Sequence, residues 1–378
     1  DVVVLGAGET RHGKVPEMSM LGFHLEAAAL AVEDSGLPHD AVDGLLVVSP
    51  LGGGDKHGFA ALLAAHLGLQ PAVAVTVDAG GATACVLVQM ARALIRDGQC
   101  RAVLCLMGTK SATVRRPQST RAPQEFTQPF GVYGAVAYHA HQARQHMDHH
   151  GLQVSDLGSV AVAMRRHASL KEGAQQRAPI TLEDHAASRI VVDPLRLLDC
   201  CQISDGGAAV LVAAGDLAAD ARQVPVTVAG AGQFSRADMF SSYVTGRGGA
   251  PATARRAFDE AGVAHEDIDV ALLYDCFTIT VLLQLEDYGF CEIGEGGAFA
   301  RDGAVELGGR LPVNTHGGLL SDSHLMGMGH IVEAVRQLRG ECGLRQVAGA
   351  RTAFVSGYGG AVHETPPAVT WSSLVLTR

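Results

Sequence analysis

Short apolar runs alternate with amphipathic segments along most of the chain. Runs such as VVVLGAG (residues 2–8) and AVLCLMG (residues 102–108) are rich in β-branched and small residues and end at glycine, which is typical of buried strands. Segments such as VLVQMARALI (86–95) and HIVEAVRQL (330–338) have the spacing of helices with one apolar face. Strands that alternate with helices in this way predict an α/β protein with parallel or mixed sheets covered by helices.

The chain also repeats itself. EDSGLPHDAVDGLLV (33–47) and DEAGVAHEDIDVALL (259–273) share an acidic helix end, a glycine, a polar link and an apolar strand, and VVVLGAG upstream matches VTVAGAG (226–232). Four elements recur in one order, which indicates duplication. We therefore expect a first half at 1–108, an inserted domain at 109–217 that returns to the first sheet, and a second half at 218–378.

Composition narrows the range of possible functions. Hydrophobic residues make up 47% of the chain and charged residues 18%, as in globular proteins. The formal net charge of -10 argues against nucleic acid as a partner, although the run at 114–121 is locally basic. The eight cysteines form no C-x-x-C pair, so we expect reduced thiols, no structural zinc and a cytoplasmic location. No apolar stretch is long enough to predict a membrane span.

Histidines gather near the start of the predicted insertion. His139, His146 and His150 fall close to one face of an expected helix, a spacing that is compatible with metal binding. The local sequence places no acidic or cysteine ligand beside them. The pattern therefore favours a solvated face or a substrate loop, and no metal site is predicted.

Motifs at the strand-to-helix junctions resemble those of the thiolase superfamily. The sterol-carrier-protein X branch carries H-D-C-F, N-x-x-G-G and G-H-P, and this chain has YDCF (274–277), NTHGG (314–318) and SHL (323–325) in the same order. The stretch from 174 to 212 also resembles the insertion of that branch. The resemblance implies the thiolase fold, a duplicated αβαβα five-layer core with an inserted loop domain, and a homodimer.

The departures from the thiolase pattern concern its nucleophiles. Thiolases carry a cysteine in a motif similar to N-N-C-A-T, whereas VDAGGAT (77–83) has Gly81 at that position. The second cysteine, in C-x-G, is replaced within VSGYGG (355–360). Cys85 lies one helical turn further on, where we expect it to pack in the core. Covalent catalysis needs a thiolate, so acyl-enzyme chemistry is not expected here.

A thiolase fold without its cysteines resembles the lipid-transfer-protein-type aldolases that shorten steroid side chains in bacteria. That resemblance implies retro-aldol cleavage of a bulky β-hydroxyacyl-CoA, with a steroid side chain as the leading substrate class, to a ketone and a shortened acyl-CoA. Coenzyme A then belongs to the substrate, and no further cofactor is implied. It also implies a small partner protein with an OB-fold and a zinc ribbon, forming a heterotetramer.

Retro-aldol cleavage needs a group to accept the β-hydroxyl proton and donors for the enolate that forms. Tyr358, among small residues, or Tyr274, at a strand end, is predicted to handle the proton. A packed aromatic with a bonded hydroxyl is the alternative for each. His324 matches the histidine of G-H-P and is predicted to hold the enolate with backbone amides at Gly81 and Gly359.

Three further polar residues beside these are candidates. Asp275 either orients a neighbouring donor or caps the following helix. Asn314 is expected to position a water or the loop of His324. His316 fits a locally satisfied histidine better than a base.

Two other functions fit the same scaffold. One is an acyl-CoA acyltransferase in which Cys85 or Cys276 has become the nucleophile. The other is a non-catalytic, thiolase-like lipid-carrier subunit.

Overall fold

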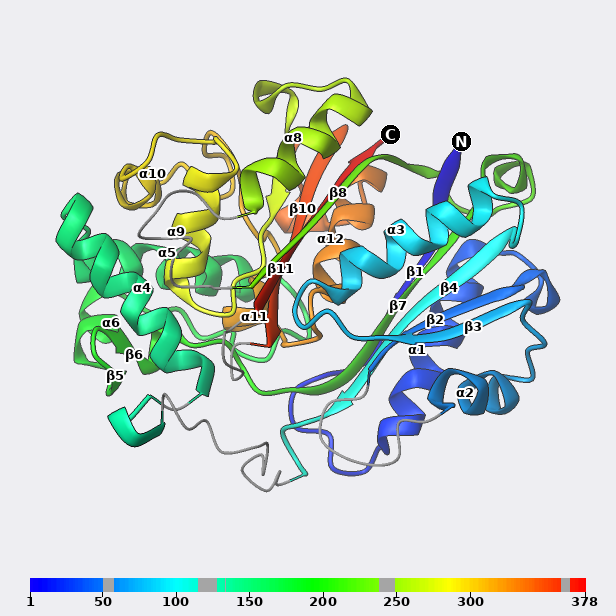
Figure 1. Ribbon diagram of the computed structural model, residues 1–378, viewed down its shortest axis with the longest axis horizontal. Coiled ribbons are helices and arrows are strands. Elements are labelled where there is room, and N and C mark those ends of the chain that lie inside the picture. The colour runs from blue at the N-terminus through cyan, green and yellow to red at the C-terminus, as the bar shows by residue number, and fades with distance from the viewer. Residues whose placement is uncertain (50–57, 115–127, 133, 238–248, 362–367) are drawn as a thin grey trace.

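Nine strands run side by side through the molecule (Figure 1). The computed structural model describes residues 1–49, 58–114, 128–132, 134–237, 249–361 and 368–378. Within these residues the strands of the main sheet are β1 (Val2–Glu9), β2 (Gly44–Val48), β3 (Val73–Val77), β4 (Ala102–Lys110), β7 (Asp205–Ala214), β8 (Val226–Ala237), β9 (Val270–Leu272), β10 (Thr352–Ala361) and β11 (Ala368–Thr377). Their order across the sheet is β3-β2-β4-β7-β1-β8-β11-β10-β9.

The sheet consists of two halves joined at its centre. In the first half β2 is parallel to β3 and to β4, and β7 is antiparallel to β4 and β1. In the second half β9 and β10 are parallel, and β11 is antiparallel to β10 and β8. The halves meet where β1 and β8 pair, with Val3 opposite Thr227 and Val4 opposite Val226. The result is one mixed sheet.

The second half repeats the first in reverse order across that junction. Strands β8, β11, β10 and β9 take the places of β1, β7, β4 and β2, and a single parallel bridge from Ala271 to Val313 stands where β3 pairs with β2. The Asp43 carboxylate accepts hydrogen bonds from two consecutive N–H groups, those of Arg101 and Ala102, at the start of β4. Asp269 accepts from the two N–H groups at the start of β10 in the same way. The duplication predicted from the sequence is confirmed.

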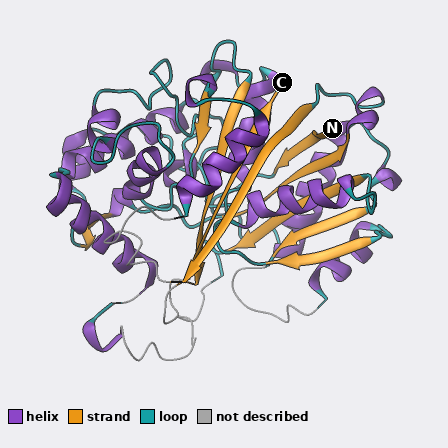
Figure 2. Cartoon of the chain, turned by 45° about the horizontal axis from the view of Figure 1, so that its top comes forward, coloured by secondary structure: helices purple, strands orange, loops and turns teal. Residues whose placement is uncertain are grey.

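Helices cover and separate the two halves (Figure 2). They are α1 (Met20–Ser35), α2 (Phe59–Leu67), α3 (Thr83–Arg96), α8 (Ala250–Ala261), α9 (Thr278–Asp287), α10 (Gly296–Arg301), α11 (Gly318–Ser321) and α12 (Met328–Arg339). One buried cluster packs α1 and α2 on the first half, a second packs α3 and α12 between the halves, and a third packs α8 and α9 on the second half. This is the five-layer α–β–α–β–α arrangement that the sequence predicts.

The segment between β4 and β7 forms most of the left side of Figure 1. It holds α4 (Gly134–His150), α5 (Val154–Ser169), α6 (Leu182–Ala187) and a hairpin of β5 (Ile190–Val192) and β6 (Leu195–Arg196). Its chain then returns to the sheet as β7. Residues 115–121 of the basic run lie outside the described residues, and the domain boundaries given above stay a prediction.

The structure corrects one of the two interpretations of the histidine face on α4, that of a solvated face, and the substrate loop stays a prediction. Of its three histidines, His139 and His146 are buried and His150 is exposed. His146 Nε2 lies 3.1 Å from a carboxylate oxygen of Glu286, which α9 brings in from far along the chain. Local periodicity places side chains on a helix face but does not say which element covers that face.

Among the described helices, none combines the length and apolar character that a membrane crossing requires.

Candidate active site

A tight turn joins β3 to α3 at Gly80 and Gly81. Gly80 has a φ of +57°, a left-handed conformation that glycine adopts readily. The Thr83 hydroxyl closes the turn, since it donates to the Gly80 carbonyl (2.6 Å) and accepts from the Ala79 N–H (2.8 Å). The N–H groups of Ala82 and Thr83 are also used within the turn. The backbone conformation therefore explains the first glycine.

The second glycine has a different cause. A Cβ atom at Gly81 would lie 2.5 Å from the Tyr274 hydroxyl oxygen and would overlap the Tyr274 ring and the Tyr358 carbonyl oxygen. Contacts this short are not possible between non-bonded atoms. Tyr274 thus occupies the volume into which any side chain at residue 81 would extend.

Tyr274 is held at the end of β9 by a buried polar network. Its N–H donates to Ser356 Oγ (3.0 Å), and its carbonyl accepts from Gln284 Nε2 (2.9 Å). Ser356 Oγ in turn donates to Gln284 Oε1 (2.6 Å). Strand β10 and helix α9 therefore fix the backbone of Tyr274 from two sides.

The Tyr274 hydroxyl faces His324. Its oxygen lies 3.4 Å from His324 Nε2, and the two rings meet edge to face with centroids 6.3 Å apart. Burial raises the pKa of Tyr274 well above its usual value, and the neighbouring Cys276, Cys201 and Asp275 add to the rise. The phenol therefore keeps its proton at neutral pH and acts as a hydrogen-bond donor.

His324 lies on a short loop between α11 and α12. The N–H of His324 donates to Ser204 Oγ (2.9 Å), just before β7. The Asp275 carboxylate accepts from the N–H groups of Leu319 (2.8 Å) and Leu320 (3.2 Å). Asp275 thus holds the backbone of α11, the helix that leads into this loop.

The NTHGG segment leads into α11. The Asn314 side chain pairs with the backbone of Leu273, accepting from its N–H (2.7 Å) and donating to its carbonyl (2.8 Å), which ties the segment to the end of β9. His316 is buried with its ring 4.9 Å from that of His330. Burial and the neighbouring His330 hold the pKa of His316 well below its usual value, so its imidazole is neutral.

Tyr358 lies on β10 on the other side of Gly81. A Cβ at the adjacent Gly359 would overlap the Gly81 nitrogen, so the two backbones are in direct contact. The Tyr358 ring, however, packs against His139 (5.8 Å between centroids) and Trp371 (6.0 Å). Burial and the nearby Cys276 raise the pKa of Tyr358, while a hydrogen bond from Gln142 opposes the rise.

The structure therefore brings Gly81, Gly359, Tyr274 and His324 together, and it places Tyr358 against the insertion. Asp275 and Asn314 hold backbone behind this group.

The two thiols considered as replacement nucleophiles are poorly placed to ionise. Cys85 is 1% exposed within the central layer, and burial raises its pKa to about 12 despite a hydrogen bond from Ser372. Cys276 Sγ lies 3.9 Å from His139 Nε2, and burial again raises the pKa to about 12. Both are thiols at neutral pH, which is the unreactive form.

Sequence reasoning missed three residues that shape the site: Gln284, Ser356 and His330. His330 Nε2 lies 2.9 Å from the Leu273 carbonyl and 3.1 Å from Asp275 Oδ1. In the sequence, Gln284 and His330 could have been found as polar residues on helix faces that otherwise carry apolar side chains. Buried polar groups of this kind need partners.

Comparisons with known proteins identify relatives of this chain. A family model described as thiolase C-terminal domain-like matches residues 239–370. A steroid side-chain-cleaving aldolase of Thermomonospora curvata is 36% identical over 89% of this chain and 90% of its own length. An acetyl-CoA acetyltransferase of Methanothermobacter thermautotrophicus is 34% identical over 95% of this chain and 96% of its own. The solved structure of an Ltp2-ChsH2(DUF35) aldolase, 34% identical, superposes with a TM-score of 0.90 over 100% of this chain and 97% of that one.

Proposed function

The chain belongs to the thiolase superfamily, and from this premise we propose that it is an aldolase that cleaves a bulky β-hydroxyacyl-CoA by a retro-aldol reaction. The observation that carries the proposal is the Tyr274 hydroxyl in the space beside Gly81. Similarity alone does not choose the reaction, because an aldolase and an acetyltransferase are related to this chain at nearly equal identity. The phenol beside Gly81 favours the aldolase, since it leaves no room for a nucleophile at that position.

The proposed reaction uses Tyr274 and His324 as a relay. The substrate β-hydroxyl gives its proton to Tyr274 Oη as Tyr274 passes its own proton to His324 Nε2, 3.4 Å away. The Cα–Cβ bond breaks, the β-carbon becomes a ketone, and the electron pair moves onto the thioester as an enolate. The proton on His324 then returns to Cα, which gives the shortened acyl-CoA. The raised pKa of Tyr274 supports a relay, because a free phenolate is unfavourable there.

The enolate oxygen needs hydrogen-bond donors throughout this reaction. We assign them to the backbone at Gly81 and Gly359, which lie against each other next to Tyr274. Coenzyme A enters as part of the substrate, and no resident cofactor or metal is assigned a role.

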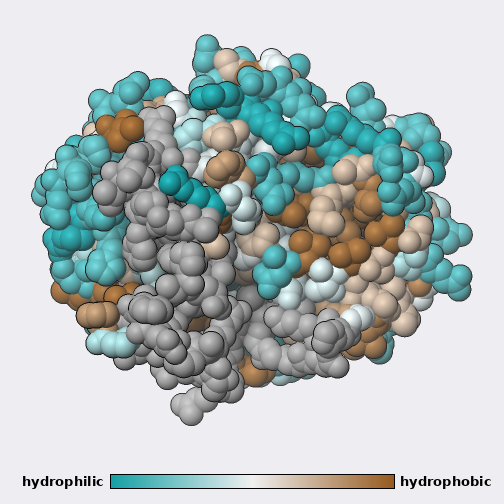
Figure 3. Space-filling model, in the orientation of Figure 1, coloured by the Kyte–Doolittle hydropathy of each residue, from teal (hydrophilic) through white to brown (hydrophobic). Residues whose placement is uncertain are grey.

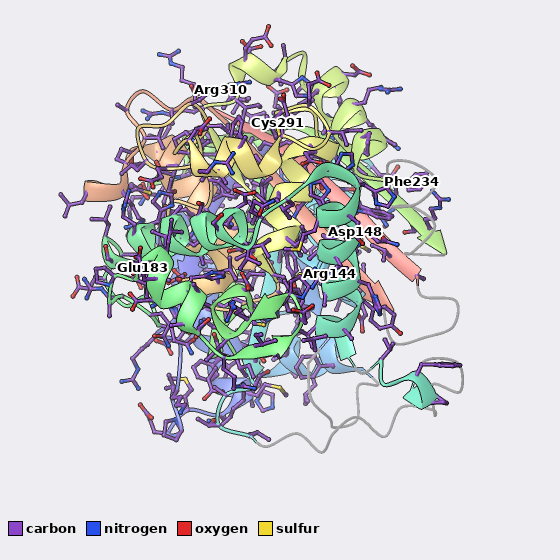
Figure 4. All side chains as sticks on the ribbon, turned by 90° about the vertical axis from the view of Figure 1, so that its left-hand side faces the viewer. Arg144, Asp148, Glu183, Phe234, Cys291 and Arg310 are labelled. Atoms are coloured by element: carbon purple, nitrogen blue, oxygen red, sulfur yellow. The ribbon has the colours of Figure 1, made fainter. Side chains whose placement is uncertain are left out.

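The acyl group is proposed to lie along an aromatic tract that leads outward from Tyr358. The Tyr358 ring is 6.0 Å from Trp371, and Trp371 is 6.5 Å from Phe234. Phe234 is 41% exposed on β8, and Figure 4 shows it at the margin of the molecule. It forms the outer end of the proposed tract. Flat aromatic faces suit an apolar polycyclic acyl group, and this supports a steroid side-chain CoA thioester as the substrate class. In this assignment Tyr358 contacts substrate but does not act as the base.

We also propose that the protein works as a dimer with a small partner bound to each copy. Strand β3 is the outer strand of the first half, and Val75 on it is 38% exposed. Figure 3 shows hydrophobic side chains over the area of β3 and its neighbouring helices. An apolar edge strand suits antiparallel pairing with a second copy. An OB-fold and zinc-ribbon protein is the proposed partner, and the name of the Ltp2-ChsH2(DUF35) aldolase supports a second component.

Product analysis tests the proposed reaction. The purified protein, with its partner, is incubated with a β-hydroxyacyl-CoA that carries a steroid side chain, and the products are identified by mass spectrometry. We expect a ketone and a shortened acyl-CoA. Tyr274→Phe removes one oxygen atom from the relay and should lower the rate about 10²–10⁴-fold. Transfer of an acyl group without a ketone product would refute the assignment.

Two controls separate the alternatives. Cys85→Ala and Cys276→Ala should both keep turnover, whereas an acyltransferase that uses either thiol would lose it and would show an acylated cysteine in the wild type. A lipid carrier would bind the substrate and release it unchanged in the presence of the partner.

A further inference from the structure

Four ionisable side chains from three parts of the chain form a buried cluster near the loop of His324. Glu9 ends β1, His12 follows it, Lys171 follows α5 of the insertion, and Asp322 follows α11. Each side chain is at most 7% exposed. Lys171 Nζ donates to both Glu9 oxygens (3.1 and 2.9 Å) and to Asp322 Oδ2 (2.7 Å). Lys171 therefore lies at the centre of the cluster.

The charges of the cluster depend on one another. Burial alone would raise the pKa of Glu9 and of Asp322, but Lys171 and His12 lower both to about 2. Burial opposes the charged form of Lys171, yet Asp322 and Glu9 raise its pKa. Arg336 Nη1 adds a further positive charge 3.4 Å from Glu9. Loss of the Lys171 ammonium would remove the charge that both buried carboxylates share, and would leave His12 beside them and Arg336 beside Glu9 as the remaining partners.

The same residues meet the distance requirements of a cation site. One ligand atom each from Glu9, His12 and Asp322 lie within 4.8 Å of one another. Lys171 Nζ is within hydrogen-bond distance of both carboxylates, so its ammonium supplies the positive charge that a metal ion would supply. The cluster therefore has a structural rather than a metal-binding arrangement.

Three connections attach the His324 loop to this part of the molecule. The Asp322 carboxylate is bonded to Lys171, and the Asp322 carbonyl accepts from the N–H of Gln175 (3.0 Å). The His324 N–H donates to Ser204 Oγ (2.9 Å), and Ser204 Oγ donates to Gln175 Oε1 (2.7 Å). Lys171 and Gln175 belong to the same stretch of the insertion. Both ends of the Asp322–His324 segment are thus fixed to it.

We propose that Lys171 is a positioning residue, which sets the distance between His324 and Tyr274 by holding Asp322. Its catalytic consequence rests on the proposed function, but its structural consequence does not. Without Lys171, Asp322 Oδ2 loses its charged partner, and His12, whose Nε2 lies 3.0 Å from Asp322 Oδ1, stays on the other oxygen. The half-compensated carboxylate would draw in water and shift the adjoining backbone. Displacement of a reacting group by about 1 Å lowers a rate by about 100-fold.

Three variants test the proposal. Lys171→Met removes the charge but keeps much of the side-chain volume, and Lys171→Arg keeps the charge. Arg339→Met is the matched control, because Arg339 is another buried cation, bonded to Asp34 (2.8 Å), at the far end of α12. The kinetic measurement is kcat and KM with the β-hydroxyacyl-CoA. The independent measurement is the imidazole NMR signal of His324, assigned with His324→Asn.

For Lys171→Met we expect kcat to fall about 100-fold while KM changes little, and the His324 imidazole signal to shift. Lys171→Arg should keep kcat and the His324 signal close to those of the wild type. Arg339→Met should alter stability but change neither kcat nor the His324 signal. Unchanged kcat and an unchanged His324 signal in folded Lys171→Met would overturn the proposal. If the wild type does not cleave the substrate, the proposed function fails, and the NMR signal alone decides the role of Lys171.

Discussion

Replacement of Gly81 by alanine tests the link between the missing side chain and Tyr274. The added Cβ would overlap the Tyr274 ring and the Tyr358 carbonyl. The ring can move, but the carbonyl belongs to β10, where Tyr358 is paired with Trp371 of β11. Overpacking of a dense interior costs about 1–3 kcal/mol, and the fixed backbone contact places Gly81→Ala towards the upper end.

The rate of Gly81→Ala should fall by more than its loss of folding stability explains. Relief of the overlap requires the Tyr274 ring to move away from residue 81, which changes its 3.4 Å approach to His324. A displacement of about 1 Å corresponds to a loss of about 100-fold in rate. Urea unfolding and the initial rate of ketone release, measured on the same preparation, give the two quantities.

The control is Gly22→Ala in the first turn of α1, where the three atoms nearest to a Cβ are side-chain atoms of Met18 and Ser19 at 3.1–3.3 Å. It should leave the rate unchanged, because the flexible Met18 side chain can move aside and no backbone atom of the site is contacted. Gly81→Ala combined with Tyr274→Ala should recover part of the stability but none of the activity. A folded Gly81→Ala protein with wild-type stability and rate would refute the argument that Tyr274 fills this space.

Other regions of the molecule give three further predictions. Phe234→Ala should raise the KM for a steroid acyl-CoA about tenfold, as expected for loss of one large aromatic contact, and leave the KM for a short acyl-CoA unchanged. If the variant and the wild type have equal KM values for the steroid acyl-CoA, the substrate does not lie along the tract. Val75→Lys should convert the dimer to a monomer in size-exclusion chromatography, and a dimer that persists would place the interface elsewhere. The pKa of Glu9 and of Asp322 is lowered to about 2, so the stabilisation they give is complete above about pH 5 and is lost as the pH falls towards 2. The urea midpoint should therefore drop less between pH 6 and pH 3 in Lys171→Met than in the wild type, and an equal drop would contradict this linkage.

The order of strands and helices was predictable because it depends on local patterns. Apolar runs that end at glycine indicate the strands, and the repeated helix–glycine–strand sequence pattern indicates the duplication. The location of Gly81 and Tyr274 at strand-to-helix junctions was also predictable, since each follows a strand that pairs in parallel with its neighbour in the sheet. Parallel strands bring their carboxyl ends to one edge of a sheet, which makes such positions good candidates for a shared site.

Contacts between the halves were not predictable from local patterns. The approach of Tyr274 to Gly81 depends on how α3 and α12 pack in the central layer. The bonds of Lys171 to Glu9 and Asp322 need the insertion to fold back over both halves. No feature near Lys171 in the sequence distinguishes it from an ordinary surface lysine, and only the docking of three separate segments buries it.

The contact between residues 81 and 274 joins the two halves of the chain. Each half contributes one strand-to-helix junction, and the two junctions are in direct contact, so a side chain removed from one leaves room for a side chain from the other. Restoring a cysteine at residue 81 by itself would not restore a nucleophile, because Tyr274 occupies its place. Removing Tyr274 by itself would open a cavity beside His324 without supplying a thiolate. Residues 81 and 274 therefore act as one unit, and a change of reaction in this scaffold requires both to change together.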